Sequence, residues 1–194
     1  MSNTCLLPPF TSDGLLPAGD FTMTIDQLHD SYLVHGPPRL GPGSVREWDA
    51  LWRSTLVSNL AALAEQLAEV GIPEVFVDGS FVEDKPHPSD IDGYFECAED
   101  ALASGLLQDR LNRLDPHACW GWDPASRRTY RGLGKRQLPM WHHYRVELYP
   151  HVPGLFSGLV DEHGHELEFP AAFRRSRRDG RPRGIIRLLT GVAA

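Results

Sequence analysis

Apolar side chains recur at steps of three and four residues in the second quarter of the chain. This spacing places them on one face of a helix. Ser44-Val45-Arg46-Glu47 has the form of a capping box, and Gly71-Ile72-Pro73 is typical of a helix end. We therefore predict the longest helix of the protein between these two signals. Its apolar positions are Trp48, Leu51, Trp52, Leu56, Leu60, Leu63, Leu67 and Val70.

Shorter segments on both sides predict strands and further helices. A capping box at Thr24–Gln27 predicts a short helix to about Tyr32, and residues 99–113 predict another helix. Strands are expected at residues 75–78, at about 90–97 and at about 142–149, and residues 115–140 are expected to be irregular. The pattern is that of an α/β (α+β) protein.

The length of 194 residues suits one domain with its own core. We divide it into an extended N-terminal arm with a short helix (1–43), a core (44–154) and a basic C-terminal segment packed on that core (155–194). Residues 1–126 hold 6 Lys/Arg and 20 Asp/Glu, and residues 127–194 hold 13 and 6. The basic part either binds a polyanion near the acidic part, or its positive charges compensate the negative charges of the acidic part within the molecule.

Composition excludes several classes of protein. No apolar run approaches the roughly 20 residues of a membrane span, and the N-terminus lacks the positive region of a secretory signal. Cys5, Cys97 and Cys119 have no CxxC spacing, and the histidines lack zinc-site spacing, so neither a disulfide framework nor a zinc site is expected. We expect a cytoplasmic protein. The sequence does not determine its oligomeric state.

Two aspartates flank an isoleucine at Asp90-Ile91-Asp92. In a strand, Asp90 and Asp92 would point to the same side with Ile91 buried behind them. Two close carboxylates repel each other unless a cation lies between them, and their hard oxygens suit magnesium. The pair therefore predicts metal-dependent chemistry on a phosphate-bearing substrate.

Gly79-Ser80 lies ten residues upstream, directly after the apolar run Val75-Phe76-Val77 and Asp78. A glycine at this point lets backbone amides approach a ligand closely, and a serine adds a hydroxyl donor. Taken alone, the pair is more often a simple turn. Its order and spacing relative to the two aspartates favour a phosphate-binding turn.

Together, Gly79-Ser80 and Asp90-Ile91-Asp92 resemble the signature of the nucleotidyltransferase superfamily, which has the polymerase-beta-like fold. The stretch around Gly79 is similar to that of small, mostly uncharacterised prokaryotic nucleotidyltransferase-like proteins. The resemblance covers about residues 70–150. It implies a minimal nucleotidyltransferase fold, with a small mixed sheet flanked by helices. It also implies a nucleoside triphosphate substrate and Mg²⁺ (or Mn²⁺) held by Asp90 and Asp92.

The resemblance also implies a third carboxylate from a later strand, and Glu147 is the best match. Glu147 would complete the metal site and help to activate the acceptor. The alternative is an ordinary pair between Glu147 and Arg145 on an exposed strand. If Glu147 belongs to the metal site, Arg145 would contact a phosphate beside it. Lys85 would also contact a phosphate, and the alternative is that it is a solvated loop lysine. Gly93 follows Asp92 where relatives usually have an apolar residue, so the strand is expected to bend or shorten.

Six arginines lie within the ten residues Arg174–Arg183. They predict a phosphate-contacting surface for an RNA or protein partner, with a solvated tail or intramolecular pairing as alternatives. Our functional hypothesis is transfer of a nucleoside monophosphate to an acceptor hydroxyl of RNA, protein or a small molecule. Small relatives of this kind occur in toxin–antitoxin and phage-defence systems. The alternative is a catalytically silent module of the same fold that binds RNA or a protein partner.

Overall fold

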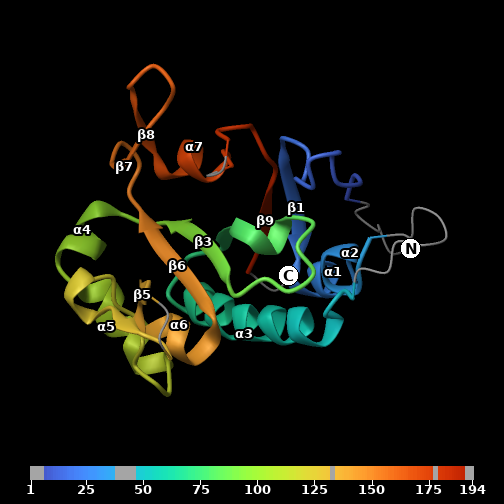
Figure 1. Cartoon of the computed structure of the whole chain (residues 1–194). Helices are drawn as coiled ribbons and strands as arrows, with labels where there is room; N and C mark the ends of the chain where they lie inside the picture. Colours follow the sequence, from blue (N-terminus) through green and yellow to red (C-terminus); the bar gives the residue numbers. More distant parts are fainter. Residues whose placement is uncertain (1–6, 38–46, 132–133, 177–178, 191–194) are drawn as a thin grey trace.

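The structure of the protein is a computed structural model that describes residues 7–37, 47–131, 134–176 and 179–190. It is a mixed α/β fold around a five-stranded sheet (Figure 1). The strand order is β1-β9-β2-β3-β6, with β1 parallel to β9, β2 antiparallel to both β9 and β3, and β3 parallel to β6. These strands are β1 (Asp20–Thr24), β2 (Glu74–Asp78), β3 (Ile91–Glu96), β6 (Val146–His151) and β9 (Ile185–Leu189). The predicted class, a small mixed sheet flanked by helices, is confirmed.

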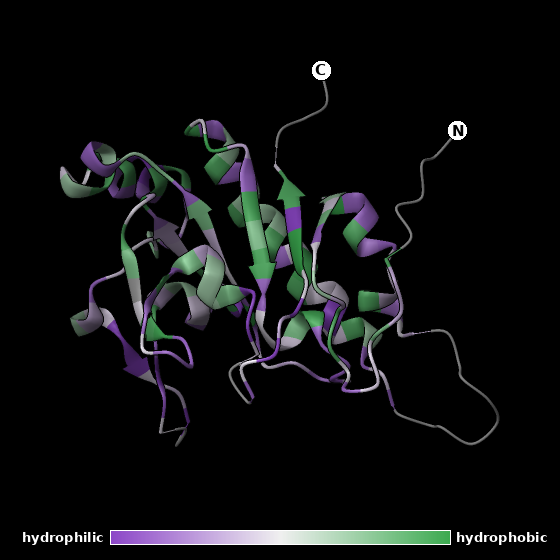
Figure 2. Cartoon of the chain, turned by 90° about the horizontal axis from the view of Figure 1, so that it is seen from above, coloured by the Kyte–Doolittle hydropathy of each residue, from purple (hydrophilic) through white to green (hydrophobic). Residues whose placement is uncertain are grey.

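Two opposite faces of the sheet are covered by different elements. Alternate residues such as Val77, Ile91 and Leu148 join the main core, which includes Leu60 and Leu63 of helix α3 (Ala50–Glu69). The other face carries a smaller cluster, in which Phe76, Tyr94 and Ile185 contact Phe173. Phe173 ends helix α7 (Phe169–Phe173). Figure 1 shows α3 on one side of the sheet and α7 on the other, and Figure 2 shows the central strands as mostly hydrophobic.

The remaining elements are short. Helices α1 (Ile25–His29) and α2 (Tyr32–His35) precede α3, and α4 (Glu99–Ala103), α5 (Leu106–Leu114) and α6 (Pro139–Tyr144) lie between β3 and β6. Two hairpins are formed by β4 (Arg128–Thr129) with β5 (Arg136–Gln137), and by β7 (Phe156–Val160) with β8 (Glu166–Glu168). Two 3₁₀ turns are Gly79–Val82 and Pro124–Ser126. Among the described residues, no helix combines the length and the apolar character that a membrane span needs.

The predicted helix signals have different outcomes. The capping box at Thr24 is confirmed, because Thr24 and Gln27 each accept from the other's backbone N–H. The predicted start of the long helix at Ser44 is wrong. Helix α3 begins at Ala50, because the carboxylate of Asp49 accepts from the Trp52 N–H and caps the first turn. The proposed capping residues Ser44–Arg46 lie outside the described residues.

Three further boundaries differ from the prediction. The helix expected at 99–113 is two helices, α4 and α5, separated by Ser104 and Gly105. The strand expected at 142–149 begins only at Val146, because Pro139 opens helix α6, for which its fixed φ is suited. The same strand runs through Pro150 to His151.

The N-terminal and the C-terminal segments of the chain each contribute a strand to the sheet. Strand β1 comes from the segment predicted as a surface arm, where Leu15, Leu16 and Met23 are buried. Strand β9 comes from the basic C-terminal segment and lies between β1 and β2. The central sheet therefore joins residues from all three segments of the chain.

Candidate functional site

Three carboxylates form a row across three adjacent strands. Asp78 of β2 is paired with Asp92 of β3, and Asp92 is paired with Glu147 of β6. Because directly paired residues project to the same face of a sheet, the three side chains share one face. It is the face that carries Phe76 and Tyr94, two residues away on the same strands. We call Asp78, Asp92 and Glu147 the acidic row; the structure thus brings together Asp92 and Glu147, as predicted.

Gly79-Ser80 follows Asp78 and opens a 3₁₀ turn beside this row. Gly79 has φ +78°, and a Cβ at this position would lie only 2.7 Å from Oδ2 of Asp92. Both the backbone angle and the contact therefore require glycine here. Gly79 therefore lies directly against the carboxylate of Asp92.

Asp90 lies directly before β3 and is buried. Its Oδ2 accepts a hydrogen bond of 2.7 Å from the indole N–H of Trp141, and its Oδ1 accepts one of 2.9 Å from the Ser89 hydroxyl. Trp141 lies on α6, so this helix fixes the orientation of the carboxylate. A carboxylate oxygen that accepts one such bond retains a lone pair for a second partner.

Glu147 is the most deeply buried member of the row, with 1% of its surface exposed. Its Oε1 accepts from the Leu138 N–H at 2.8 Å, and its Oε2 accepts from the Tyr149 hydroxyl at 2.6 Å. Burial and the charge of Glu147 raise the pKa of Tyr149, so that its hydroxyl stays protonated and continues to donate. Arg127 Nη1 lies 3.6 Å from Oε1 of Glu147, and Arg127 Nη2 donates to Tyr149 at 2.9 Å.

Arg145 is not on the strand with Glu147. It follows α6 with a left-handed backbone (φ +56°), and its guanidinium lies 3.8 Å from the ring centroid of Trp141 and 4.1 Å from that of Tyr130. The basic partner near Glu147 is Arg127, not Arg145. Arg145 therefore lies on the Asp90 side of the site, through Trp141.

Lys85 is exposed in the loop between Gly-Ser and the two aspartates. Its backbone carbonyl accepts from Arg53 Nη1 at 2.8 Å. Arg53 is fully buried in α3 and also donates to the carbonyls of Leu33 and Phe81. Burial lowers the pKa of Arg53 to about 9. This arginine holds the loop that follows Gly79-Ser80 against the core helix.

Arg183 is the basic partner of the row at its Asp78 end. It is 5% exposed, and it contacts Asp78 through Nη2 and Glu83 through Nη1, the latter at 2.7 Å. Asp78, Arg127 and Arg183 were not predicted from the sequence as members of the site. Asp78 directly precedes Gly79, which is a usable signal, whereas nothing in the sequence pairs Arg183 with it.

The strand around Gly93 is regular. All six residues of β3 are in register with β6, so the expected bend or shortening is wrong. A Cβ on Gly93 would lie 2.5 Å from the Phe76 carbonyl oxygen and 2.9 Å from Leu148. The glycine permits close packing of β2, β3 and β6 at the position next to Asp92.

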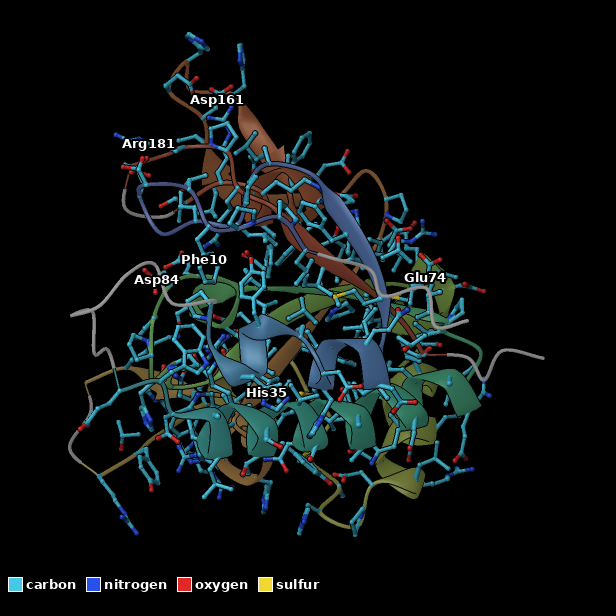
Figure 3. All side chains as sticks on the ribbon, turned by 90° about the vertical axis from the view of Figure 1, so that its right-hand side faces the viewer. Phe10, His35, Glu74, Asp84, Asp161 and Arg181 are labelled. Carbon is cyan, nitrogen blue, oxygen red and sulfur yellow. The ribbon has the colours of Figure 1, made fainter. Side chains whose placement is uncertain are left out.

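The donor chemistry of Asp90, Asp92 and Glu147 suits a hard divalent cation, and Gly79 lets the Asp92 carboxylate approach the backbone of the turn closely. The ligand atoms of these three side chains do not all lie within 4.8 Å of one another. Among the described residues, the cluster whose donor atoms all lie within 4.8 Å of one another is a different one, His29, Asp30 and His35. Figure 3 shows His35 near helix α3. Asp90 and Glu147 each accept two protein hydrogen bonds, and each of these carboxylate oxygens keeps a lone pair for a further partner.

The arginines of the C-terminal segment are paired with carboxylates. Arg174 contacts Asp20, with N–O distances of 2.9 and 2.6 Å, and Arg175 contacts Glu162 at 2.6 Å. Arg181 contacts Asp13, and Arg183 contacts Asp78. Intramolecular pairing, one of the alternatives from the sequence, thus holds for these four. Arg177 and Arg178 lie outside the described residues, and Figure 3 shows Arg181 far from helix α3.

A family model described as a family of unknown function (DUF6932) matches residues 8–189, and the chain belongs to this family. Neither the curated proteins nor the solved structures gave a match. The match spans both terminal strands of the sheet together with the acidic row.

Proposed function

We propose that this member of the DUF6932 family is a metal-dependent nucleotidyltransferase that moves a nucleoside monophosphate from a triphosphate to an acceptor hydroxyl. The observation that carries the proposal is the direct pairing of Asp92 with Glu147, with Gly79-Ser80 against Asp92. A turn with a close backbone approach beside hard oxygen ligands is the arrangement that a metal–triphosphate needs. The family's unknown function leaves this proposal to rest on the site itself.

In this proposal Asp90 and Asp92 hold Mg²⁺ or Mn²⁺. When bound, the ion neutralises phosphate charge and orients the reacting groups. The Ser89 and Trp141 bonds to Asp90 orient one of these ligands without using all of its lone pairs.

The protein's own groups would bind and orient the triphosphate. Backbone N–H groups and the hydroxyl of the Gly79-Ser80 turn would donate to the phosphates, and Arg53 would keep the following loop in place. The acceptor oxygen attacks the α-phosphorus, the bond from that phosphorus to the β-phosphate oxygen breaks, and pyrophosphate leaves. The hydroxyl proton passes to a carboxylate oxygen of the acidic row.

The test is calorimetric titration of the protein with ATP, GTP, CTP and UTP in the presence of magnesium. We expect binding of at least one triphosphate that requires magnesium and that Asp92→Asn removes. Glu65→Gln is the matched control, because Glu65 is exposed near the C-terminal end of α3, and this variant should bind as the wild type does. Equal binding by Asp92→Asn and wild type would contradict the proposed site.

A second candidate is the catalytically silent module of the same fold. It is favoured by the state of Glu147, whose two oxygens accept bonds from Leu138 and Tyr149 and which also lies next to Arg127. A carboxylate held in this way serves the fold without a metal. Binding of no triphosphate by a folded wild-type protein would select this candidate.

A further inference from the structure

A second basic segment lies beside the acidic row. Residues 127–136 contain five cations and no acidic residue. The cations lie on and next to the β4–β5 hairpin, and we call this group the basic hairpin. Its members are Arg127, Arg128, Arg131, Lys135 and Arg136.

The basic hairpin is tied to both ends of the candidate site. Arg127 lies 3.6 Å from Glu147, and the Leu138 N–H, directly after β5, donates to the same carboxylate. On the other side, the Tyr130 ring packs edge-on against Trp141 at 5.3 Å between centroids, and Trp141 donates to Asp90. These contacts fix the position of the hairpin relative to both carboxylates.

The outer four cations of the basic hairpin point to solvent. All four are exposed, and within the part of the chain that the structure describes no carboxylate lies within 4.0 Å of their charged groups. The C-terminal arginines differ, because four of them are held by carboxylates. Four exposed cations without a carboxylate partner form a local anion-binding surface on a chain of net charge −7.

We propose that the basic hairpin binds the phosphodiester backbone of a single-stranded nucleic acid and presents a hydroxyl of that strand to the acidic row. This inference rests on the proposed function, and it names the acceptor class. Four cations beyond Arg127 exceed what one metal-bound triphosphate needs, whereas a strand offers a phosphate at every nucleotide. Tyr130 is half-buried among them, and its ring centroid lies 5.3 Å from the guanidinium of Arg131 and 4.1 Å from that of Arg145.

The experiment measures binding of a labelled 20-nucleotide RNA and of the DNA of the same sequence by fluorescence anisotropy at low salt. The hairpin variant replaces the four outer cations by glutamine, and a control variant removes four cations elsewhere on the surface. The hairpin positions are Arg128, Arg131, Lys135 and Arg136. The control positions are Arg110, Arg113, Arg175 and Arg181.

We expect the hairpin variant to bind the strand at least about 30-fold more weakly than wild type, and the control variant to stay within about threefold. The slope of log K against log salt should fall by about 0.7 for each phosphate that the hairpin variant no longer neutralises. Preference for the RNA or for the DNA identifies which strand is the acceptor, and either supports the proposal. Equal weakening in both variants would overturn the proposal, because binding would then depend on the overall charge of the protein and not on the basic hairpin.

Titration of the same variants with magnesium and the triphosphate separates this inference from the proposed function. Wild type that binds the triphosphate but neither strand overturns the inference and leaves the nucleotidyltransferase proposal in place. Wild type that binds a strand but no triphosphate overturns the assignment of the strand as acceptor. Loss of triphosphate binding in the hairpin variant, with strand binding unchanged, also overturns the inference.

Discussion

Two segments of this protein are rich in arginine, and they differ in what faces their charges. In the segment Arg174–Arg183, four described arginines meet carboxylates, three of them from residues far away in the sequence. In the basic hairpin, only Arg127 lies near a carboxylate among the described residues, and the other four cations are exposed. The denser run of arginines is therefore the less available one.

In each segment, one arginine also lies at an end of the acidic row. Arg183 reaches Asp78 and is 5% exposed, whereas the side chain of Arg127 near Glu147 is 26% exposed. Arg183 has two carboxylate partners, and Arg127 has one at a longer distance together with the Tyr149 hydroxyl. The first arginine acts as part of the core, and the second lies where a ligand can compete for it.

The largest expected effect on stability comes from replacing Arg183. Arg183→Met should lower the free energy of unfolding by about 3–5 kcal/mol, because it removes a buried cation that pairs with both Asp78 and Glu83. Urea denaturation followed by circular dichroism measures this decrease.

Arg127→Met is the matched comparison at the other end of the row. It should cost about 1 kcal/mol or less, because the pair is longer and partly open to water. Equal decreases in stability for the two variants would remove the distinction between a core arginine and a ligand-facing one.

An intermediate effect, smaller than at Arg183 and larger than at Arg127, is expected at Tyr149, which connects Glu147 to Arg127. Tyr149→Phe removes the only hydroxyl that donates to Oε2 of Glu147 among the described residues, so the free energy of unfolding should fall by about 1–3 kcal/mol. Tyr130→Phe is the control, because the Tyr130 side chain contacts its neighbours through the ring. The prediction fails when both variants are as stable as the wild type in the same urea titration.

The α/β class, the long helix, and the strand that carries Asp92 could be predicted because each depends on local periodicity. The place of β9 in the sheet could not, because a strand from the C-terminus that inserts between β1 and β2 leaves no local signal. Helix α6 was missed for a related reason: His142 and Tyr144 also fit an alternating pattern, whereas Pro139 favours the first turn of a helix.

In the candidate site, the sequence motifs and the family resemblance that they carry were enough to select Gly79 and Glu147, both of which lie next to Asp92. These signals were not enough to identify the arginines that contact the carboxylates of the site. Arg145 was selected for its place two residues before Glu147, but the helix before β6 turns it onto Trp141. Arg127 reaches Glu147 across 20 residues of chain, through a hairpin whose pairing depends on tertiary contacts.

The smallest expected effect concerns Arg175 and Glu162, a pair in which the side chains are 36% and 60% exposed. A double-mutant cycle with Arg175→Met and Glu162→Gln should give a coupling of about 0.2–1 kcal/mol at low salt, since water and side-chain entropy weaken exposed pairs. The coupling should vanish in about 1 M salt, where the Debye length is roughly 3 Å. A coupling that persists in salt would show that Arg175 is held as firmly as Arg183. The C-terminal segment would then be one rigid ion-pair network and not a buried anchor with exposed neighbours.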